Sequence, residues 1–362
     1  MVENVYIHIP FCRQKCYYCS FISFAKYELK EKYVNALINE IKNIYNNESL
    51  KTLYFGGGTP SLLSTAEFNR IVNIFNITSD TEITAELNPE NLSLNYLKDL
   101  KNIGINRLSF GCQTFNDKTL KIIGRRHSSY DVEKALEFAY DAGFNNISLD
   151  FIYGLPNQNI DDFVKDLKKA AAKDIQHISL YGLKIDKNCY FYNHPPANLP
   201  DDDLQADMYL QAVEFLSDNN FIHYEISNFA KSGFFSKHNL NYWNNNTYYG
   251  FGIGAHGYTN GYRYENTTDF EEYFANPKHK KKHKLCTEEQ LEEEIFLGFR
   301  KTAGINIKSI NDKFNIDFEK KYKTILDKYL STGHIKELNG NYCLTVDGIL
   351  LSNTVLADFL RI

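Results

Sequence analysis

The sequence has little that would place the protein in a membrane, outside the cell or on nucleic acid. Among its 362 residues no apolar run approaches the length of about 20 residues that spans a bilayer. The chain reaches Cys12 too soon for a signal peptide to precede it. Its net charge of −5 gives no reason to expect general binding to nucleic acid or anionic lipid. We therefore expect a cytoplasmic globular protein with no nucleic-acid partner.

Cysteine is also scarce outside one short stretch. There are seven cysteines, an odd number. Four of them are scattered along the chain: Cys112, Cys189, Cys286 and Cys343. Such scattering, without a pairing pattern, indicates a reducing compartment rather than a disulfide framework.

The other three cysteines, Cys12, Cys16 and Cys19, follow a short strand-like run in C-x3-C-x2-C spacing. Three thiolates so close in sequence can hold one face of an iron–sulfur cluster, and because a [4Fe–4S] cube has four irons, one iron stays open. The alternative is a zinc knuckle, but structural zinc takes four ligands that usually arrive as two separated pairs. No second pair is present, so the spacing predicts a [4Fe–4S] site with an open iron.

Alternating strand and helix patterns follow the cysteines. After the run that precedes Cys12, strand-like runs occur at 52–60, 82–89, 107–113, 146–156 and 177–183. Helical periodicity separates them, at 29–45, 66–75, 94–103, 132–140 and 161–172, and returns at 204–216. Because parallel strands need crossover connections, this order predicts an α/β fold, a partial (β/α)6 TIM-type barrel over residues 1–230.

Glycine and polar residues gather at the carboxyl ends of the predicted strands, where barrel active sites are built. After the cysteines, the successive strand ends carry Gly56–Gly57–Gly58–Thr59, Glu86, Gln113 and Asp150. Each of these residues alone is as consistent with a turn or a satisfied polar group. Their shared location predicts a ligand site.

Residues 231–286 are predicted to be a connecting segment rich in aromatic residues, Asn and Gly. It contains a literal G-x-G-x-x-G at Gly252, Gly254 and Gly257. The dinucleotide fingerprint has to open a helix after a strand, and the residues that follow show no helical period, so we expect no nicotinamide site. The basic run KHKKKHK at 278–284 is predicted to be a solvated linker, with contact to an anionic partner as the alternative.

Residues 287–362 have the pattern of a separate unit. Helical periodicity covers 288–302, 307–314 and 318–330, and a last helix is predicted at 349–360. Asn339–Gly340 is a strong hairpin signal between them. The pattern predicts a small C-terminal winged-helix-like α+β domain. Such domains often bind DNA, but acidic residues outnumber basic ones here, so a structural or lid role is favoured.

Three motifs, YIHIPFC, GGGTP and DFIYGLP, resemble the radical S-adenosylmethionine (SAM) superfamily and, within it, the HemN/HemW branch. The resemblance extends over nearly the whole chain. It implies that the three clustered cysteines hold a [4Fe–4S] cluster whose fourth iron is chelated by SAM. It also implies the SAM contacts Tyr6, Tyr18, Gly57, Gly58, Thr59, Glu86, Gln113, Arg125 and Asp150. These roles are physically sensible, because glycine permits close backbone approach, carboxylates accept from ammonium or ribose groups, and arginine pairs with a carboxylate.

Three features separate the oxidase and chaperone groups of this branch. Oxidases read C-x3-C-x2-C-x-C, whereas Phe21 stands here at the last position. Oxidases also carry an N-terminal extension, whereas this chain begins eleven residues before Cys12. The run HNLNYW matches the H-N-x-x-Y-W motif of the chaperone group, which implies heme contacts at His238, Tyr242 and Trp243. A hydrogen-bonded structural histidine is the alternative for His238.

The resemblance therefore implies a heme chaperone that binds heme, a [4Fe–4S] cluster and SAM and passes heme to an acceptor protein, which need not be soluble. The alternative is an oxygen-independent coproporphyrinogen III oxidase, a radical SAM enzyme of oxidative decarboxylation. RNA modification is a third hypothesis, and it rests only on the lysine run and the winged-helix-like unit.

Overall fold

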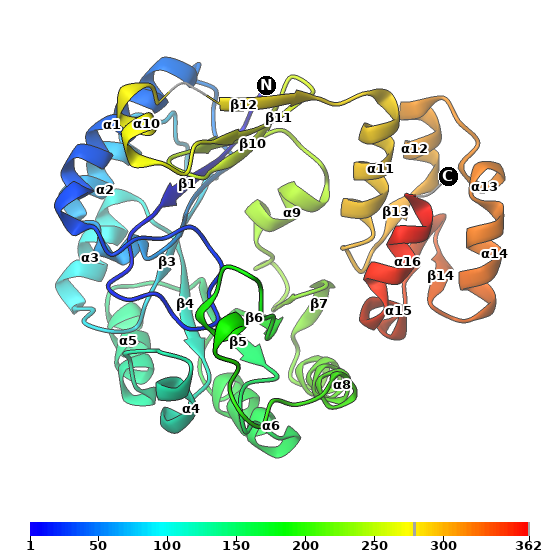
Figure 1. Cartoon of the computed structure of the whole chain (residues 1–362), viewed down its shortest axis with the longest axis horizontal. Helices are drawn as coiled ribbons and strands as arrows, with labels where there is room; N and C mark the ends of the chain where they lie inside the picture. The colour runs from blue at the N-terminus through cyan, green and yellow to red at the C-terminus, as the bar shows by residue number, and fades with distance from the viewer. Residues whose placement is uncertain (278–279, 361–362) are drawn as a thin grey trace.

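The computed structural model describes residues 1–277 and 280–360. Its main feature is a nine-stranded sheet in the order β7-β8-β6-β5-β4-β3-β2-β1-β9 (Figure 1). The strands β1 to β6 run parallel to one another. Their bounds are Asn4–Ile9, Thr52–Gly57, Glu82–Leu87, Arg107–Gln113, Ile147–Tyr153 and His177–Gly182. The predicted α/β partial barrel is confirmed.

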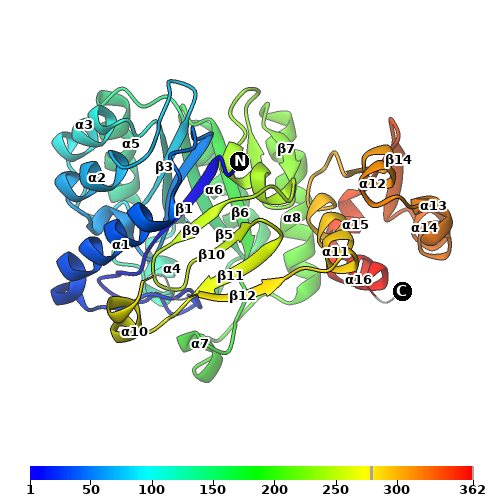
Figure 2. The same cartoon turned by 90° about the horizontal axis from the view of Figure 1, so that it is seen from above.

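Helices cover the outer face of this sheet, as Figures 1 and 2 show. They are α1 (Lys30–Ile44), α2 (Thr65–Val72), α3 (Leu94–Ile103), α4 (Asp117–Ile122), α5 (Ser129–Asp141), α6 (Ile160–Ala171) and α8 (Asp202–Asp218). Shorter helical turns are η1 (Tyr27–Leu29), η2 (Pro60–Leu62) and α7 (Tyr190–Asn193). Local sequence starts the helices: Ser64 and Ser128 each form a capping box, which satisfies backbone N–H groups of the first turn.

The two faces of the parallel strands differ in chemistry. One face packs beneath the helices and is apolar, with Ile7, Phe55, Ala85, Phe110, Leu149 and Ile178 buried in the main core. The opposite face carries Tyr54, Glu86, Ser109, Asp150 and Ser179, which line an internal space. Since side chains alternate along a strand, one alternation of apolar and polar residues places apolar side chains in the core and polar side chains around an interior space that a ligand can enter.

The sheet ends in different ways at its two edges. β7 (Ile222–Glu225) and β8 (Asn228–Ala230) are antiparallel additions beyond β6. At the other edge β9 (Tyr249–Phe251) pairs in parallel with β1. Part of the predicted connecting segment therefore belongs to the same sheet as the barrel strands.

A second sheet follows, formed by β10 (His256–Thr259), β11 (Tyr262–Asn266) and β12 (Lys280–Lys284) in antiparallel order. Gly252 and Gly254 lie between β9 and β10, and Gly257 lies within β10, so the G-x-G-x-x-G run opens no helix. Helix α9 (Lys237–Trp243) precedes β9 in sequence, and α10 (Phe270–Ala275) lies between β11 and β12.

Residues 280–284 form strand β12 instead of the expected loop, and Lys280 is buried, whereas residues 281–284 are exposed as expected. Lys278 and His279 lie outside the described residues. The physical reason for the strand is one buried lysine. Lys280 Nζ lies 2.6 Å from Glu40 Oε1 on α1, and their side chains are only 4% and 0% exposed. Glu40 also accepts hydrogen bonds from Gly252 N, Asn266 and Tyr273. This network ties β12 to the barrel.

The C-terminal unit has its own core, which includes Ile295, Phe299, Phe318, Leu326 and Phe359. Its elements are α11 (Thr287–Gly298), β13 (Ile305–Asn306), α12 (Ile307–Phe314), α13 (Phe318–Lys321), α14 (Lys323–Ser331), β14 (Ile335–Leu338), β15 (Asn341–Leu344), α15 (Val346–Leu350) and α16 (Ser352–Phe359). The predicted hairpin at Asn339–Gly340 joins β14 to β15. The helices predicted at 318–330 and 349–360 are each divided in two.

Within the described part of the chain, none of the helices is both long and apolar enough to span a bilayer.

Candidate functional site

The loop with the three cysteines crosses the carboxyl ends of the parallel strands. Cys12 N donates to Phe24 O at 3.1 Å and Phe24 N donates to Pro10 O at 2.8 Å, so the loop folds back on itself. The three thiols are partly buried and line one end of a cavity of about 430 Å³, which we call the cysteine cavity. This volume lies in the usual range for small-molecule pockets.

The cysteine cavity brings together most of the residues singled out from the sequence. They are Cys12, Cys16, Tyr18, Cys19, Gly57, Gly58, Thr59, Glu86, Gln113, Arg125 and Asp150. Tyr6 is the exception, because it lines a neighbouring chamber instead. Residues from β2, β3, β4 and β5 thus meet the cysteine loop at one mouth, as expected for the carboxyl ends of a parallel sheet.

The electrostatics around the thiols suit metal-bound thiolates. Arg125 Nη1 lies 3.6 Å from Cys16 Sγ, and the Thr59 hydroxyl lies 3.4 Å from Cys12 Sγ. Burial raises the pKa of Cys12 and raises that of Cys19 to about 11. Insertion of a cluster would therefore release protons, because thiolates are the ligands.

The [4Fe–4S] cluster that the cysteine spacing predicts needs one thiolate for each of three irons. Among the described residues, no three Cys, His, Asp or Glu side chains converge on a point where one ion could be held. A cube does not need such convergence, since each cysteine binds its own iron. The donor set of three thiols beside an arginine fits a [4Fe–4S] cluster.

The far side of the cysteine cavity is acidic. Glu86 accepts from the Tyr54 hydroxyl at 2.7 Å and from Gly57 N at 3.3 Å, and burial raises its pKa to about 7. Asp150 accepts from Ser109 Oγ at 2.9 Å, and burial raises its pKa as well. A ligand that brings a cation or hydroxyl donors would relieve the cost of holding two buried carboxyl groups here.

One glycine keeps the cavity wall open. A Cβ at Gly111 would lie 2.9 Å from Gln113 Nε2 and 3.2 Å from Arg125 Nη2. Gln113 itself has φ of 67°, which is unusual for a residue other than glycine, at the irregular end of β4. Backbone shape and side chains therefore cooperate to present an amide and a guanidinium to the cavity.

Three polar residues of the site, Asn88, Ser109 and Arg107, escaped the sequence-based predictions. Asn88 Oδ1 accepts from Arg125 Nη2 at 2.8 Å, and Ser109 Oγ donates to Asp150 at 2.9 Å. Arg107 is buried beside Glu86 and Asp150. A signal was present: polar residues recur at every second position of strands whose other residues are apolar, whereas parallel strands are usually apolar on both faces.

Behind Glu86 and Asp150 lies a smaller chamber of about 200 Å³, the inner chamber, which Tyr6, Arg107 and His238 also line. His238 is 1% exposed, and burial lowers its pKa to about 3. Both of its ring nitrogens are engaged, Nδ1 with Thr52 Oγ1 at 2.7 Å and Nε2 with the Tyr242 hydroxyl at 2.8 Å. His238 is therefore a neutral, hydrogen-bonded histidine in this structure.

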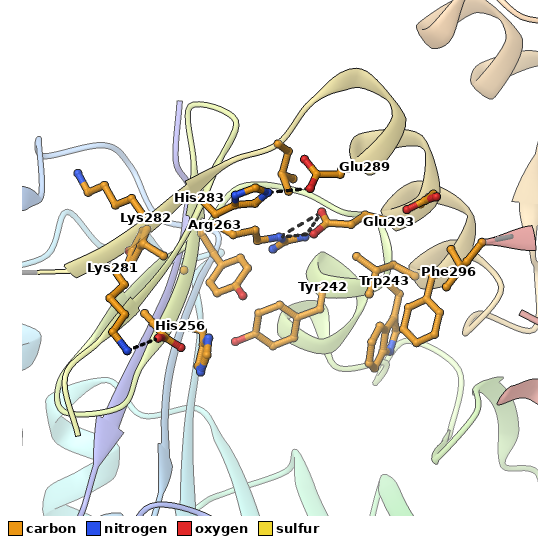
Figure 3. Close-up of a pocket in the computed structure, with 18 residues that line it drawn as sticks. Tyr242, Trp243, His256, Arg263, Lys281, Lys282, His283, Glu289, Glu293 and Phe296 are labelled. Carbon is orange, nitrogen blue, oxygen red and sulfur yellow. Dashed lines mark hydrogen bonds and ion pairs between the residues drawn. The ribbon is translucent and has the colours of Figure 1, made fainter. Parts of the chain in front are cut away.

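A third cavity, of about 960 Å³, lies between the second sheet, α9 and α11 (Figure 3). Tyr242 and Trp243 line it, and we call it the aromatic cavity. The structure thus divides the predicted heme residues: His238 faces the inner chamber, Trp243 faces the aromatic cavity, and Tyr242 borders both.

Comparison with known proteins agrees with this architecture. Residues 6–170 match the model of the radical SAM superfamily, and residues 285–351 match that of the HemN C-terminal domain. The solved coproporphyrinogen III oxidase HemN of Escherichia coli superposes with a TM-score of 0.86 at 21% identity, over 99% of this chain and 90% of that one, which shows a shared fold.

Curated relatives match over the full length. The chain is 39% identical to the heme chaperone HemW of Bacillus subtilis, over 99% of both chains. It is 37% identical to the heme chaperone HemW of Lactococcus lactis, over 99% of this chain and 97% of that one. A [4Fe–4S] cluster and SAM are the cofactors that the superfamily implies. The chain therefore belongs to the HemW family of the radical SAM superfamily.

Proposed function

We propose that the protein is a heme chaperone, which binds heme and passes it to an acceptor protein. The observation that carries this proposal is the near-complete match to relatives named heme chaperone, at 39% identity over 99% of both chains. A match of that extent covers the cysteine loop, the α9 motif and the C-terminal unit together.

The cysteine cavity would hold the two cofactors. Cys12, Cys16 and Cys19 would ligate a [4Fe–4S] cluster, and Arg125, Glu86 and Asp150 would receive the charged groups of SAM. When bound, such a cluster supplies single electrons to SAM. The residues of this chain would exclude water and orient the sulfonium compound, a role supported by the fact that both carboxyl groups and the guanidinium line the same cavity.

One residue at the cavity rim favours heme handling over porphyrinogen oxidation. Phe21 lines the cysteine cavity with 68% of its surface exposed, at the position where the oxidase pattern has a further cysteine. The likeness to HemN, at 21% identity, concerns the fold alone.

The proposal includes a cytoplasmic location. All seven cysteines are free, as expected in a reducing compartment. The acceptor is then a protein that is exposed to the cytoplasm, either soluble or bound to a membrane.

The test is anaerobic reconstitution followed by heme titration and transfer. We expect saturable heme binding, seen as a shifted heme absorption band, and movement of the heme to an apo-hemoprotein that is separated afterwards. Coproporphyrinogen III is offered in parallel with SAM and a reductant. Absence of saturable heme binding would overturn the proposal. Conversion of the porphyrinogen to its decarboxylated product would overturn it in favour of the oxidase.

A further inference from the structure

The second sheet presents one face to the aromatic cavity. In its register His256 pairs with Glu265 and Glu265 pairs with Lys281, so these three side chains form one cross-strand row. Tyr258, Arg263 and His283 form the next row on the same face. Figure 3 shows His256, Arg263, Lys281 and His283 on the sheet side of the cavity.

The two histidines of this face differ in availability. His283 Nε2 lies 2.8 Å from Glu289 Oε1 on α11, so it is already engaged. The His256 imidazole makes no hydrogen bond or ion pair with any residue that the structure describes, and the side chain is exposed to the cavity. A neutral imidazole with a free nitrogen is a suitable axial ligand for heme iron.

Aromatic side chains form the wall opposite the sheet. Tyr242 and Trp243 project from α9, and Phe296 from α11, with Tyr242 pointing toward His256 in Figure 3. The Arg300 guanidinium packs over the Trp243 ring, 4.8 Å from the centroid of the ring. Flat aromatic surfaces of this kind suit the face of a porphyrin.

His238 contacts this aromatic wall only through Tyr242. His238 lies one helical turn before Tyr242 and hydrogen-bonds its hydroxyl at 2.8 Å. The buried imidazole thereby fixes the Tyr242 ring at the border of the cavity, so His238 is a positioning residue.

Cations able to pair with heme propionates line the aromatic cavity, which also carries Glu265, Glu289, Glu292 and Glu293. Lys281 pairs with Glu265 at 3.3 Å, but its side chain is 82% exposed, so this pair is weak and its ammonium is available. Arg263 pairs with Glu293 at 2.7 Å on the same sheet face. A volume of about 960 Å³ is at the large end for a small-molecule site, as a porphyrin requires.

We propose that heme binds in the aromatic cavity with His256 as its axial ligand, packed against Tyr242 and Trp243, and that His238 supports the site without ligating the iron. This inference rests on the proposed heme-chaperone function and names the binding site within the same protein.

The test titrates heme into the full-length protein and into His256→Ala, His283→Ala and His238→Ala. His283→Ala is the matched control, since both histidines are exposed on the same sheet face. We expect His256→Ala to lose the histidine-ligated absorption and resonance Raman spectrum and to weaken heme affinity on the order of tenfold. Added imidazole should restore the spectrum, while His283→Ala should retain it.

His238→Ala separates the two histidine assignments. We expect it to keep the histidine-ligated spectrum, with a weaker affinity because Tyr242 loses its support. If His238→Ala loses that spectrum and His256→Ala keeps it, the site proposed here is wrong, whereas the heme-chaperone function stands. If the unaltered protein shows no saturable heme binding, the function itself fails.

Discussion

The cysteine cavity and the aromatic cavity are built in opposite ways. The first is assembled from the ends of neighbouring parallel strands and from one loop, and its polar groups already contact one another. The second is formed between α9, the second sheet and α11, which follow one another in the chain after the barrel strands. The difference teaches that the proposed SAM site depends on the barrel itself, whereas the proposed heme site depends on how later segments pack onto the barrel.

The largest effect expected from this comparison concerns Cys12. Replacing Cys12 with Ala leaves two thiols, too few to hold a cube, so we expect complete loss of iron–sulfur absorbance and bound iron after anaerobic reconstitution. Heme binding in the aromatic cavity should persist, because no cysteine lines it. Cys286→Ser is the control, since serine keeps the helix cap of α11. Normal cluster content in Cys12→Ala would contradict the assignment.

The second effect concerns the attachment of the second sheet. Lys280→Ala leaves the buried Glu40 carboxylate without its cation, which should lower the free energy of unfolding by about 3–5 kcal/mol. Lys281→Ala, one residue away but exposed, should change it by less than about 0.5 kcal/mol. Chemical denaturation measures both. Equal losses in the two variants would mean that the buried pair does not hold the sheet.

A third effect should be confined to the cysteine cavity. Asp150→Asn removes the charge that we expect SAM to meet, and a charge-assisted hydrogen bond contributes about 1.5–3 kcal/mol, so SAM affinity should fall roughly 10- to 100-fold. Heme affinity should stay unchanged. Asp166→Asn is the control, because Asp166 is also buried but lines neither cavity. Calorimetric titration with SAM measures both affinities. An unchanged SAM affinity in Asp150→Asn would show that Asp150 does not contact SAM.

The smallest effect is a change in pH dependence. Burial raises the pKa of Glu86 from its ordinary 4.5 to about 7, so between these values the folded protein holds a proton that the unfolded chain has released. Glu86 therefore contributes stability at low pH that is lost as the pH rises toward 7. Glu86→Gln should remove this loss, which amounts to at most about 1.4 kcal/mol per pH unit. Denaturation curves of the two proteins from pH 5 to 8 test this prediction. Parallel profiles of unfolding free energy against pH would contradict it.

Much of the fold could be predicted because the signals are local. Strand and helix periodicity gave the barrel order, and Asn339–Gly340 gave the C-terminal hairpin. The strand-end residues meet in one cavity because parallel strands bring their carboxyl ends to one edge. Tyr6 lies within β1 and not at its carboxyl end, and it lines the inner chamber instead of that cavity.

The lysine run shows where local signals fail. Lysine is usually solvated, and nothing near Lys280 in sequence reveals that Glu40 on a distant helix will pair with it. The role of His238 was likewise open, because its partner Thr52 lies on β2, far from it in sequence.

The sequence by itself determined the three-cysteine spacing, the order of the barrel elements and the resemblance to the radical SAM superfamily, since each depends on residues close together in the chain. Only the tertiary structure decided which histidine is buried and which is free. That distinction depends on strand register and on packing between distant segments: the fold buries His238 of α9 against Thr52 of β2 and leaves His256 facing an open cavity.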